Sequence, residues 1–202
     1  QGESDAGQPD NDAKLRELFT GWRAQFGSQT KMLVVQLADY GKRVSEPAAS
    51  GWAQLRQEQL DAVQADANAA LITAIDLGEP TDIHPANKND LGKRLAGAFA
   101  GDPMPMPQGA ALAGGNVTVT FSGIEGSLVA LGGASALGIE LCGKTQDSCR
   151  YVSPQLVGNS MVIPADGQPA VRVRHAWSDA PIVNLYDQRG MPVPGFELEV
   201  TQ

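Results

Sequence analysis

One histidine of this chain lies where α/β enzymes place a catalytic base. His84 follows the apolar run 70–75, which has the composition of a buried strand, and it precedes Pro85 and a helical pattern. Loops at the carboxyl ends of parallel strands hold the sites of such enzymes. A neutral imidazole there can accept a serine proton, and Asp82 or Glu79 is near enough to orient it. From residue types alone the alternative is a capping loop, with Pro85 starting the helix and His84 as an incidental cap.

The other residues with chemical capacity favour structural roles. His175 lies inside a strand-like pattern, where a structural histidine is expected. Trp177 and Tyr186 can stack on a sugar ring, although packing in the core or between domains is the favoured interpretation.

The two cysteines, Cys142 and Cys149, enclose a short polar segment. Their spacing is not that of a CxxC motif, and no second Cys/His pair completes a metal site, so we expect neither a metal nor a cofactor. The turn-like residues between them favour a disulfide across a hairpin over two free thiols. A disulfide in turn favours a periplasmic or secreted location.

The elements that position His84 form a pattern of alternating helices and strands. Apolar residues recur at helical spacing from Leu15 to Phe26, from Trp52 to Val63 and from Leu91 to Phe99. The continuous apolar runs 32–37 and 70–75 have the composition of buried parallel strands. We therefore predict that residues 1–101 are one half of an α/β domain, a parallel sheet flanked by helices. Two strands make a small sheet, so further strands are expected upstream.

The pattern changes after the proline-rich stretch 101–107, which we interpret as a linker. Short apolar or alternating runs then follow, separated by Gly, Pro, Asn and Asp, at residues 117–121, 128–131, 161–163, 171–174 and 196–200. Many short strands with frequent turns indicate a small β-sandwich or jelly-roll module over residues 102–202.

Composition limits the class of partner. The 202 residues carry a formal net charge of −8, which argues against nucleic acid or an anionic membrane surface as a partner. No apolar run reaches the roughly 20 residues needed to span a bilayer. The chain opens with Gln1 and has neither an initiator methionine nor a signal peptide, so we expect a processed product or the later part of something longer.

Two blocks of the sequence resemble the sialate O-acetylesterase family of SGNH-type hydrolases. Residues 76–85, Asp-Leu-Gly-Glu-Pro-Thr-Asp-Ile-His-Pro, are similar to the last conserved block of that family, and residues 1–4, Gln-Gly-Glu-Ser, are similar to an internal block. Weaker similarity lies between and after these blocks, at residues 15–22, 34–38, 52–56, 87–88, 92–96, 176–177, 184–186 and 190–192.

The resemblance implies a carbohydrate O-acetylesterase that acts by serine–histidine chemistry on O-acetylated sugars or polysaccharides. His84 is the implied general base, Gln1 an oxyanion donor, and Gly2 and Glu3 belong to the same loop. Many SGNH hydrolases carry the acid three residues before the histidine, where this chain has Thr81. The acid is therefore Asp82, Glu79 or absent.

The family's serine lies in an earlier block, which Ser4, Ser45 and Ser50 do not match, and no GxSxG motif occurs. The resemblance thus implies that an N-terminal segment of the same enzyme, as a separate chain, supplies the nucleophile. The substrate is an acetylated sialic acid or an acetylated xylan or xyloglucan. The rival interpretation is a non-catalytic carbohydrate-binding fragment.

Overall fold

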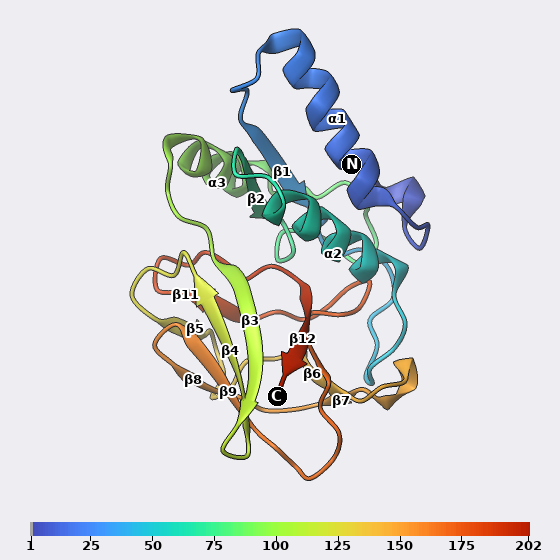
Figure 1. Cartoon of the computed structure of the whole chain (residues 1–202), viewed down its shortest axis with the longest axis vertical. Coiled ribbons are helices and arrows are strands. Elements are labelled where there is room, and N and C mark those ends of the chain that lie inside the picture. Colours follow the sequence, from blue (N-terminus) through green and yellow to red (C-terminus); the bar gives the residue numbers. More distant parts are fainter. Residues whose placement is uncertain (1) are drawn as a thin grey trace.

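The computed structural model describes residues 2–202, apart from the side chain of residue 146. The fold is mixed α/β, with few helices and a large, curled, mostly antiparallel sheet. Three helices and two short strands lie at one end of the molecule, and the large sheet occupies the other end (Figure 1). In the described residues no helix has both the length and the apolar composition that crossing a membrane requires.

The first half has the predicted alternation of helices and strands. After a short 3-10 turn, η1 (Glu3–Asp5), the order is α1 (Asn11–Phe26), β1 (Met32–Gln36), α2 (Gly51–Gln64), β2 (Ala69–Thr73) and α3 (Lys88–Ala100). β1 and β2 pair in parallel, with Met32 opposite Ala69 and Gln36 opposite Thr73. Together they form a two-stranded sheet in the described residues.

A polar side chain caps the N-terminus of α2 and of α3. The Ser50 hydroxyl accepts a hydrogen bond from the Ala53 amide at 2.9 Å and caps α2. The Asn87 carboxamide accepts from the Asp90 amide at 3.2 Å and caps α3. The expectation that His84 caps this helix, with Pro85 as its first residue, is therefore wrong. Asn87 caps the helix instead, because its short side-chain oxygen reaches the free amide groups of the first turn.

The second half contains strands β3 to β12. Eight of them form one sheet in the order β7-β6-β10-β12-β3-β4-β9-β8, which is antiparallel except for the β12–β3 pair. β5 and β11 form a separate antiparallel pair. The bounds are β3 Met106–Ala113, β4 Asn116–Ser122, β5 Leu128–Ala130, β6 Ile139–Cys142, β7 Arg150–Tyr151, β8 Gln155–Val157, β9 Ser160–Pro164, β10 Arg172–His175, β11 Leu185–Asp187 and β12 Phe196–Thr201; η2 spans Gln146–Ser148.

Two details of the second half differ from the sequence-based expectation. The strands form one continuous curled sheet instead of the two facing sheets of a simple sandwich. The end of the predicted linker, Met106 and Pro107, already belongs to β3, and the register of β3 against β4 shifts at Pro107 to Gly109. A bulge accommodates a residue without an N–H inside a paired strand.

Buried side chains from both halves form one apolar cluster. Phe19, Leu60 and Leu71 of the first half belong to the same cluster as Val117 and Phe196 of the second. The Gln36 carboxamide also joins the halves, because its Nε2 donates to the Gly195 carbonyl at 2.9 Å. Whether residues 1–101 and 102–202 are separate domains stays a prediction.

One expected core face is not buried. Leu18, Trp22 and Phe26 of α1 were predicted to lie on the buried side of the helix with Phe19, but each is more than half exposed. Phe19 alone of these four packs into the core. Periodicity identifies an apolar face correctly, but it does not say which chain covers that face.

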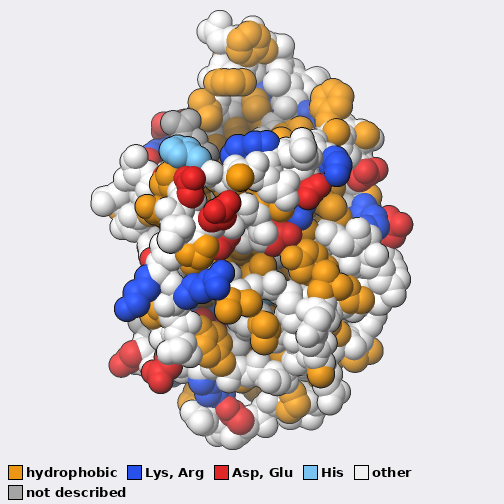
Figure 2. Space-filling view, turned by 180° about the vertical axis from the view of Figure 1, so that it is seen from behind, with side chains coloured by type: hydrophobic (Ala, Val, Ile, Leu, Met, Phe, Trp, Pro, Cys, Tyr) orange, Lys and Arg blue, Asp and Glu red, His pale blue; other side chains and the backbone are white. Residues whose placement is uncertain are grey.

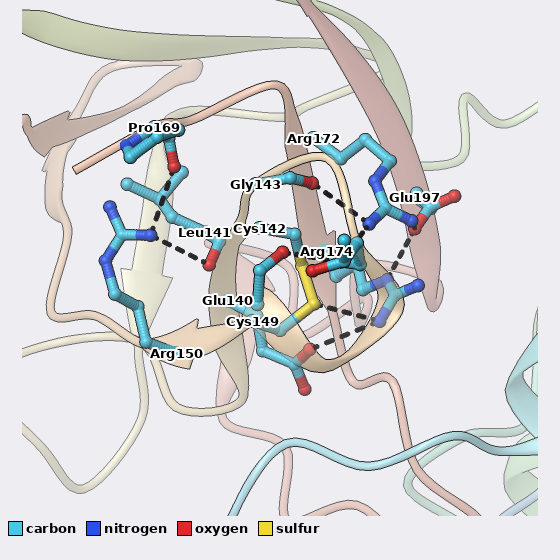
Figure 3. The surroundings of a disulfide bond; sticks show 12 residues. Glu140, Leu141, Cys142, Gly143, Cys149, Arg150, Pro169, Arg172, Arg174 and Glu197 are labelled. Atoms are coloured by element: carbon cyan, nitrogen blue, oxygen red, sulfur yellow. Dashed lines mark hydrogen bonds and ion pairs between the residues drawn. A yellow bond between two sulfur atoms is a disulfide. The ribbon is translucent and has the colours of Figure 1, made fainter.

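The predicted disulfide is confirmed. Cys142 at the end of β6 is bonded to Cys149, seven residues later, and η2 lies between them (Figure 3). In the described residues no cysteine remains free.

Replacing both cysteines with serine should lower the free energy of unfolding by about 2 kcal/mol, because opening so short a loop releases little chain entropy. Urea unfolding of the double variant against the parent measures the change. Thiol labelling of the unfolded, unreduced parent should detect no free thiol, and finding two would contradict the pairing.

Candidate active site

The loop that carries His84 leaves the carboxyl end of β2 and is held at several points. Its first residues are buried, with Ile75 and Leu77 in the interior. The Gly41 amide donates to the Pro80 carbonyl at 3.0 Å, which ties the loop to the segment after β1. The Asp82 amide donates to the Glu79 carbonyl at 3.2 Å and closes a tight turn. The turn presents the following residues to solvent.

His84 and Asp82 lie together on this turn. The Asp82 carboxylate accepts a hydrogen bond from the His84 backbone amide at 2.8 Å, and its Oδ1 lies 3.7 Å from the imidazole Nδ1. The two side chains are 89% and 59% exposed. A small rotation of the ring would bring Nδ1 within hydrogen-bonding distance and leave Nε2 facing outward, which is the arrangement of an oriented base.

The other candidate acid is less well placed. Glu79 is exposed and forms no hydrogen bond or ion pair with His84 within residues 2–202. The turn thus pairs a histidine with an aspartate, and among residues 2–202 no hydroxyl group is hydrogen bonded to that histidine ring.

Gly2 and Glu3 lie at the beginning of the 3-10 turn η1, Gly2 as its N-cap and Glu3 as its first residue, and Gln1 lies outside the described residues. Gly2 has a φ of 128°, a conformation that favours glycine, and an added Cβ would lie 3.3 Å from a methyl group of Leu55. Neither residue makes a hydrogen bond or ion pair with Asp82 or His84 in the described chain. Both line a second feature of the surface, a hollow beside β1.

The hollow beside β1 has a volume of about 620 Å³. Its walls are η1, α1 and the first four residues of β1, and they include the exposed Leu18 and Trp22. Apolar side chains gather at this end of the molecule in the space-filling view, where a surface histidine also lies (Figure 2). The hollow lies along β1, which among the described residues pairs with a strand on one side only, β2.

His175 has the structural role that its position in a strand predicted. The ring is completely buried, and its Nδ1 donates to the Pro194 carbonyl at 2.9 Å. Burial lowers the pKa of the imidazole to about 4, so it is neutral at physiological pH.

Sequence reasoning missed a row of side chains on the large sheet. Tyr151, Glu140, Arg174 and Glu197 stand opposite one another on β7, β6, β10 and β12. The Arg174 Nε donates to Glu197 at 2.5 Å, and its Nη1 lies 3.8 Å from a Glu140 oxygen (Figure 3). Arg174 is 2% exposed, and the Trp177 ring lies over its guanidinium.

Burial on the sheet changes the pKa of one carboxyl group in this row, that of Glu140. Burial raises the pKa of the Glu140 carboxyl to about 7, although the positive charge of Arg174 opposes the shift. Glu140, Cys142 and Cys149 have the atom types of a metal site. They do not fit a cation, because both sulfurs are in the disulfide and Arg174 donates to the Cys149 sulfur at 3.2 Å.

One comparison identifies a solved structure with the same fold. The carbohydrate acetylesterase XAC1771 from Xanthomonas citri superposes with a TM-score of 0.84 and 29% sequence identity over 96% of this chain. The match covers 47% of that protein, so this chain spans about half its length.

Other comparisons add little. Domains 1–6 of the surface layer protein SbsC align with a TM-score of 0.37 and 14% identity, over 71% of this chain and 18% of that one, which is too low to indicate a common fold. No protein-family model and no curated protein sequence matches the chain.

Proposed function

We propose that the chain is part of a carbohydrate O-acetylesterase of SGNH type. The observation that carries the proposal is the structural match to a carbohydrate acetylesterase over 96% of this chain at 29% identity. The exposed histidine–aspartate pair after β2 supports it, since that is where a base for acyl transfer belongs in an α/β fold. A non-catalytic sugar-binding fragment would not require this pair.

In the proposed reaction a serine oxygen bonds to the acetyl carbonyl carbon while His84 accepts the hydroxyl proton. The bond between the acetyl carbon and the sugar oxygen then breaks, and His84 returns the proton to that oxygen. Water attacks the acetyl-serine, His84 takes a water proton, and acetate leaves as the serine regains a proton. Asp82 orients the imidazole, and Gln1 donates to the developing oxyanion, with Gly2 and Glu3 shaping the loop.

We further propose that an N-terminal segment of the same enzyme, present as a separate chain, supplies the serine and covers the hollow beside β1. The unpaired edge of β1 and the exposed Leu18 and Trp22 favour a partner that adds a strand and apolar side chains. The chain's match to 47% of XAC1771 agrees with a larger protein. The disulfide supports a periplasmic or secreted location.

The substrate within the class of O-acetylated sugars is proposed as an acetylated polysaccharide such as xylan or xyloglucan, with acetylated sialic acid as the second candidate. The formal net charge of −8 weighs against an acidic sugar. Acetate release from acetylated xylo-oligosaccharides and from 9-O-acetyl sialic acid, measured side by side, decides between the two.

Labelling with a phosphonate that reacts with activated serines tests whether the nucleophilic serine belongs to a segment other than this chain. The native sample should release acetate from 4-nitrophenyl acetate, and peptide mapping should place the label on a serine that is not in this chain. The chain purified alone should be inactive, because no hydroxyl of its described residues hydrogen bonds to His84. Label on Ser4, Ser45 or Ser50, or full activity of the chain alone, would contradict the proposal.

A further inference from the structure

We propose that a cavity on the second half of the chain binds a neutral sugar unit of the acetylated polysaccharide, at a distance from the ester that is cleaved. We call it the Trp177 cavity; its volume is about 410 Å³. Residues from four places in the sequence line it, among them Arg43, Leu137, Glu140, Tyr151, Trp177 and Ile182. The volume lies in the range of small-molecule sites. The inference rests on the proposed function for the identity of the polysaccharide.

The walls of the Trp177 cavity offer apolar and aromatic surface to a ligand. Tyr151 is 44% exposed and Ile182 58% exposed, whereas Trp177 is nearly buried and held by the Arg174 guanidinium, 4.4 Å from the ring centre. Exposed apolar side chains around a hollow indicate a binding surface. Aromatic rings present apolar area to the C–H face of a pyranose and, in tyrosine, a hydroxyl group at the edge.

Glu140 gives the cavity a polar group whose Oε2 pairs with Arg174 Nη1 only at 3.8 Å, beyond hydrogen-bonding distance. The side chain is 1% exposed, and its Oε2 has no hydrogen-bond donor among the described residues. Tyr151 stands directly opposite Glu140 on the neighbouring strand, so both side chains lie on one face of the sheet. Buried carboxyl oxygens are normally hydrogen bonded, and a sugar hydroxyl entering the cavity would supply the missing donor.

The charges around the cavity favour a neutral ligand over an acidic one. Arg174 already pairs with Glu197 and Glu140 and lies against the Trp177 ring. Arg43 is the cationic side chain among the described lining residues, and it lies on an exposed loop. The buried guanidinium of Arg174 is already shared between two carboxylates, Glu140 and Glu197, so a ligand carboxylate would add a third negative charge to one cation, whereas hydroxyl groups carry no such cost.

The cavity is connected to the His84 turn through one segment of the chain. Residues 37–50 contribute Arg43 and Val44 to the cavity wall. The same segment donates from the Gly41 amide to the Pro80 carbonyl and from the Tyr40 amide to the Asp179 carbonyl, at 3.0 and 3.1 Å. It thus contacts the loop of His84 on one side and the segment of Trp177 on the other. A polysaccharide is long enough to occupy both places.

Calorimetric titration of the assembled enzyme tests the cavity without relying on catalysis. The probes are xylohexaose and a xyloglucan heptasaccharide, both free of acetyl groups, and N-acetylneuraminic acid. At least one neutral probe should bind, and Tyr151→Ala and Glu140→Gln should each raise its Kd at least tenfold. Val157→Ala removes an exposed apolar side chain of β8 outside the cavity, and it should leave the Kd within twofold.

Hydrolysis of 4-nitrophenyl acetate separates this inference from the proposed function. Both cavity variants should keep the turnover of that small ester, because it does not reach the cavity, while KM for acetylated xylo-oligosaccharides should rise about tenfold. If the parent protein hydrolyses no ester but binds the oligosaccharide, and both variants lose that binding, the cavity proposal is supported and the proposed esterase function is contradicted. Unchanged binding in both variants, binding of the acidic probe alone, or binding of no probe would overturn the cavity.

Discussion

His84→Ala in the assembled enzyme should lower kcat for acetyl esters by about three orders of magnitude or more. Without the imidazole the serine stays protonated, and no group of the turn replaces the base. His84 is 89% exposed and its ring forms no close hydrogen bond, so the free energy of unfolding should change by less than about 0.5 kcal/mol. Turnover of 4-nitrophenyl acetate and urea unfolding of the same preparation measure both quantities.

The second histidine is the matched control. His175 is completely buried and donates to the Pro194 carbonyl, so His175→Ala should lower the free energy of unfolding while kcat of the folded fraction stays nearly intact. His84→Ala should therefore lower kcat and leave stability unchanged, whereas His175→Ala should lower stability and leave kcat nearly unchanged. A folded His84→Ala protein with parental turnover would remove His84 from the catalytic machinery.

Substitution of the neighbouring acid separates a triad from a dyad. Asp82 lies 3.7 Å from the His84 Nδ1, and Asp82→Asn should cost as much as His84→Ala if the carboxylate fixes the tautomer of the ring. The cost should be smaller if serine and histidine act as a dyad. Glu79→Gln is the comparison, because Glu79 forms no hydrogen bond or ion pair with the ring in the described residues, and this variant should keep the parental kcat.

Arg56→Met should lower the free energy of unfolding by about 3–5 kcal/mol, enough to unfold a marginal protein. The Arg56 side chain is completely buried and donates four hydrogen bonds to backbone carbonyl groups, those of Leu37 at 2.9 Å, Ala38 at 2.9 Å, Ser178 at 2.7 Å and Asp179 at 3.0 Å. Methionine fills a similar volume but leaves these oxygens without donors.

The four carbonyl groups belong to both halves of the chain, so we expect the loss of Arg56 to destabilise the whole fold. Leu37 and Ala38 follow β1 in the first half, whereas Ser178 and Asp179 lie in the second half, so one guanidinium holds the two together. Burial lowers the pKa of Arg56 to about 9, with Asp39 and Asp179 opposing the shift, so the group remains charged at neutral pH.

Arg16→Met is the matched control for Arg56. Arg16 pairs with Asp12 one turn earlier on the exposed side of α1, and such surface pairs contribute less than about 1 kcal/mol. Urea unfolding of both variants, with an unchanged m-value, measures the difference. A loss below about 1 kcal/mol for Arg56→Met would show that other contacts hold the halves together.

Local patterns in the sequence determined the elements of the first half and the disulfide. The apolar runs at 32–37 and 70–75 and the helical periodicities correspond to β1, β2 and the three helices within a few residues. The seven-residue separation of Cys142 and Cys149 required only a local turn, which a short polar segment supplies. In these cases nearest-neighbour chemistry is enough, because each element is specified by residues close together in the chain.

The nature of the candidate site was predicted from the sequence only in part. The strand–loop–helix order around His84 and its closeness to Asp82 followed from residues 70–95, since both depend on local structure. The helix start did not, because Pro85 and Asn87 both satisfy local rules, and in the structure the Asn87 side chain caps α3.

Only the tertiary structure decided which charged and apolar side chains are buried. Arg174 and Glu140 lie on strands that are distant in the sequence, and pairing of β6 with β10 places them side by side in the interior, with the Trp177 ring over Arg174. Trp22 lies on an apolar helical face that predicts burial, yet it is exposed. Burial depends on partners that are distant in the sequence or lie in another chain, and a window of neighbouring residues contains no information about them.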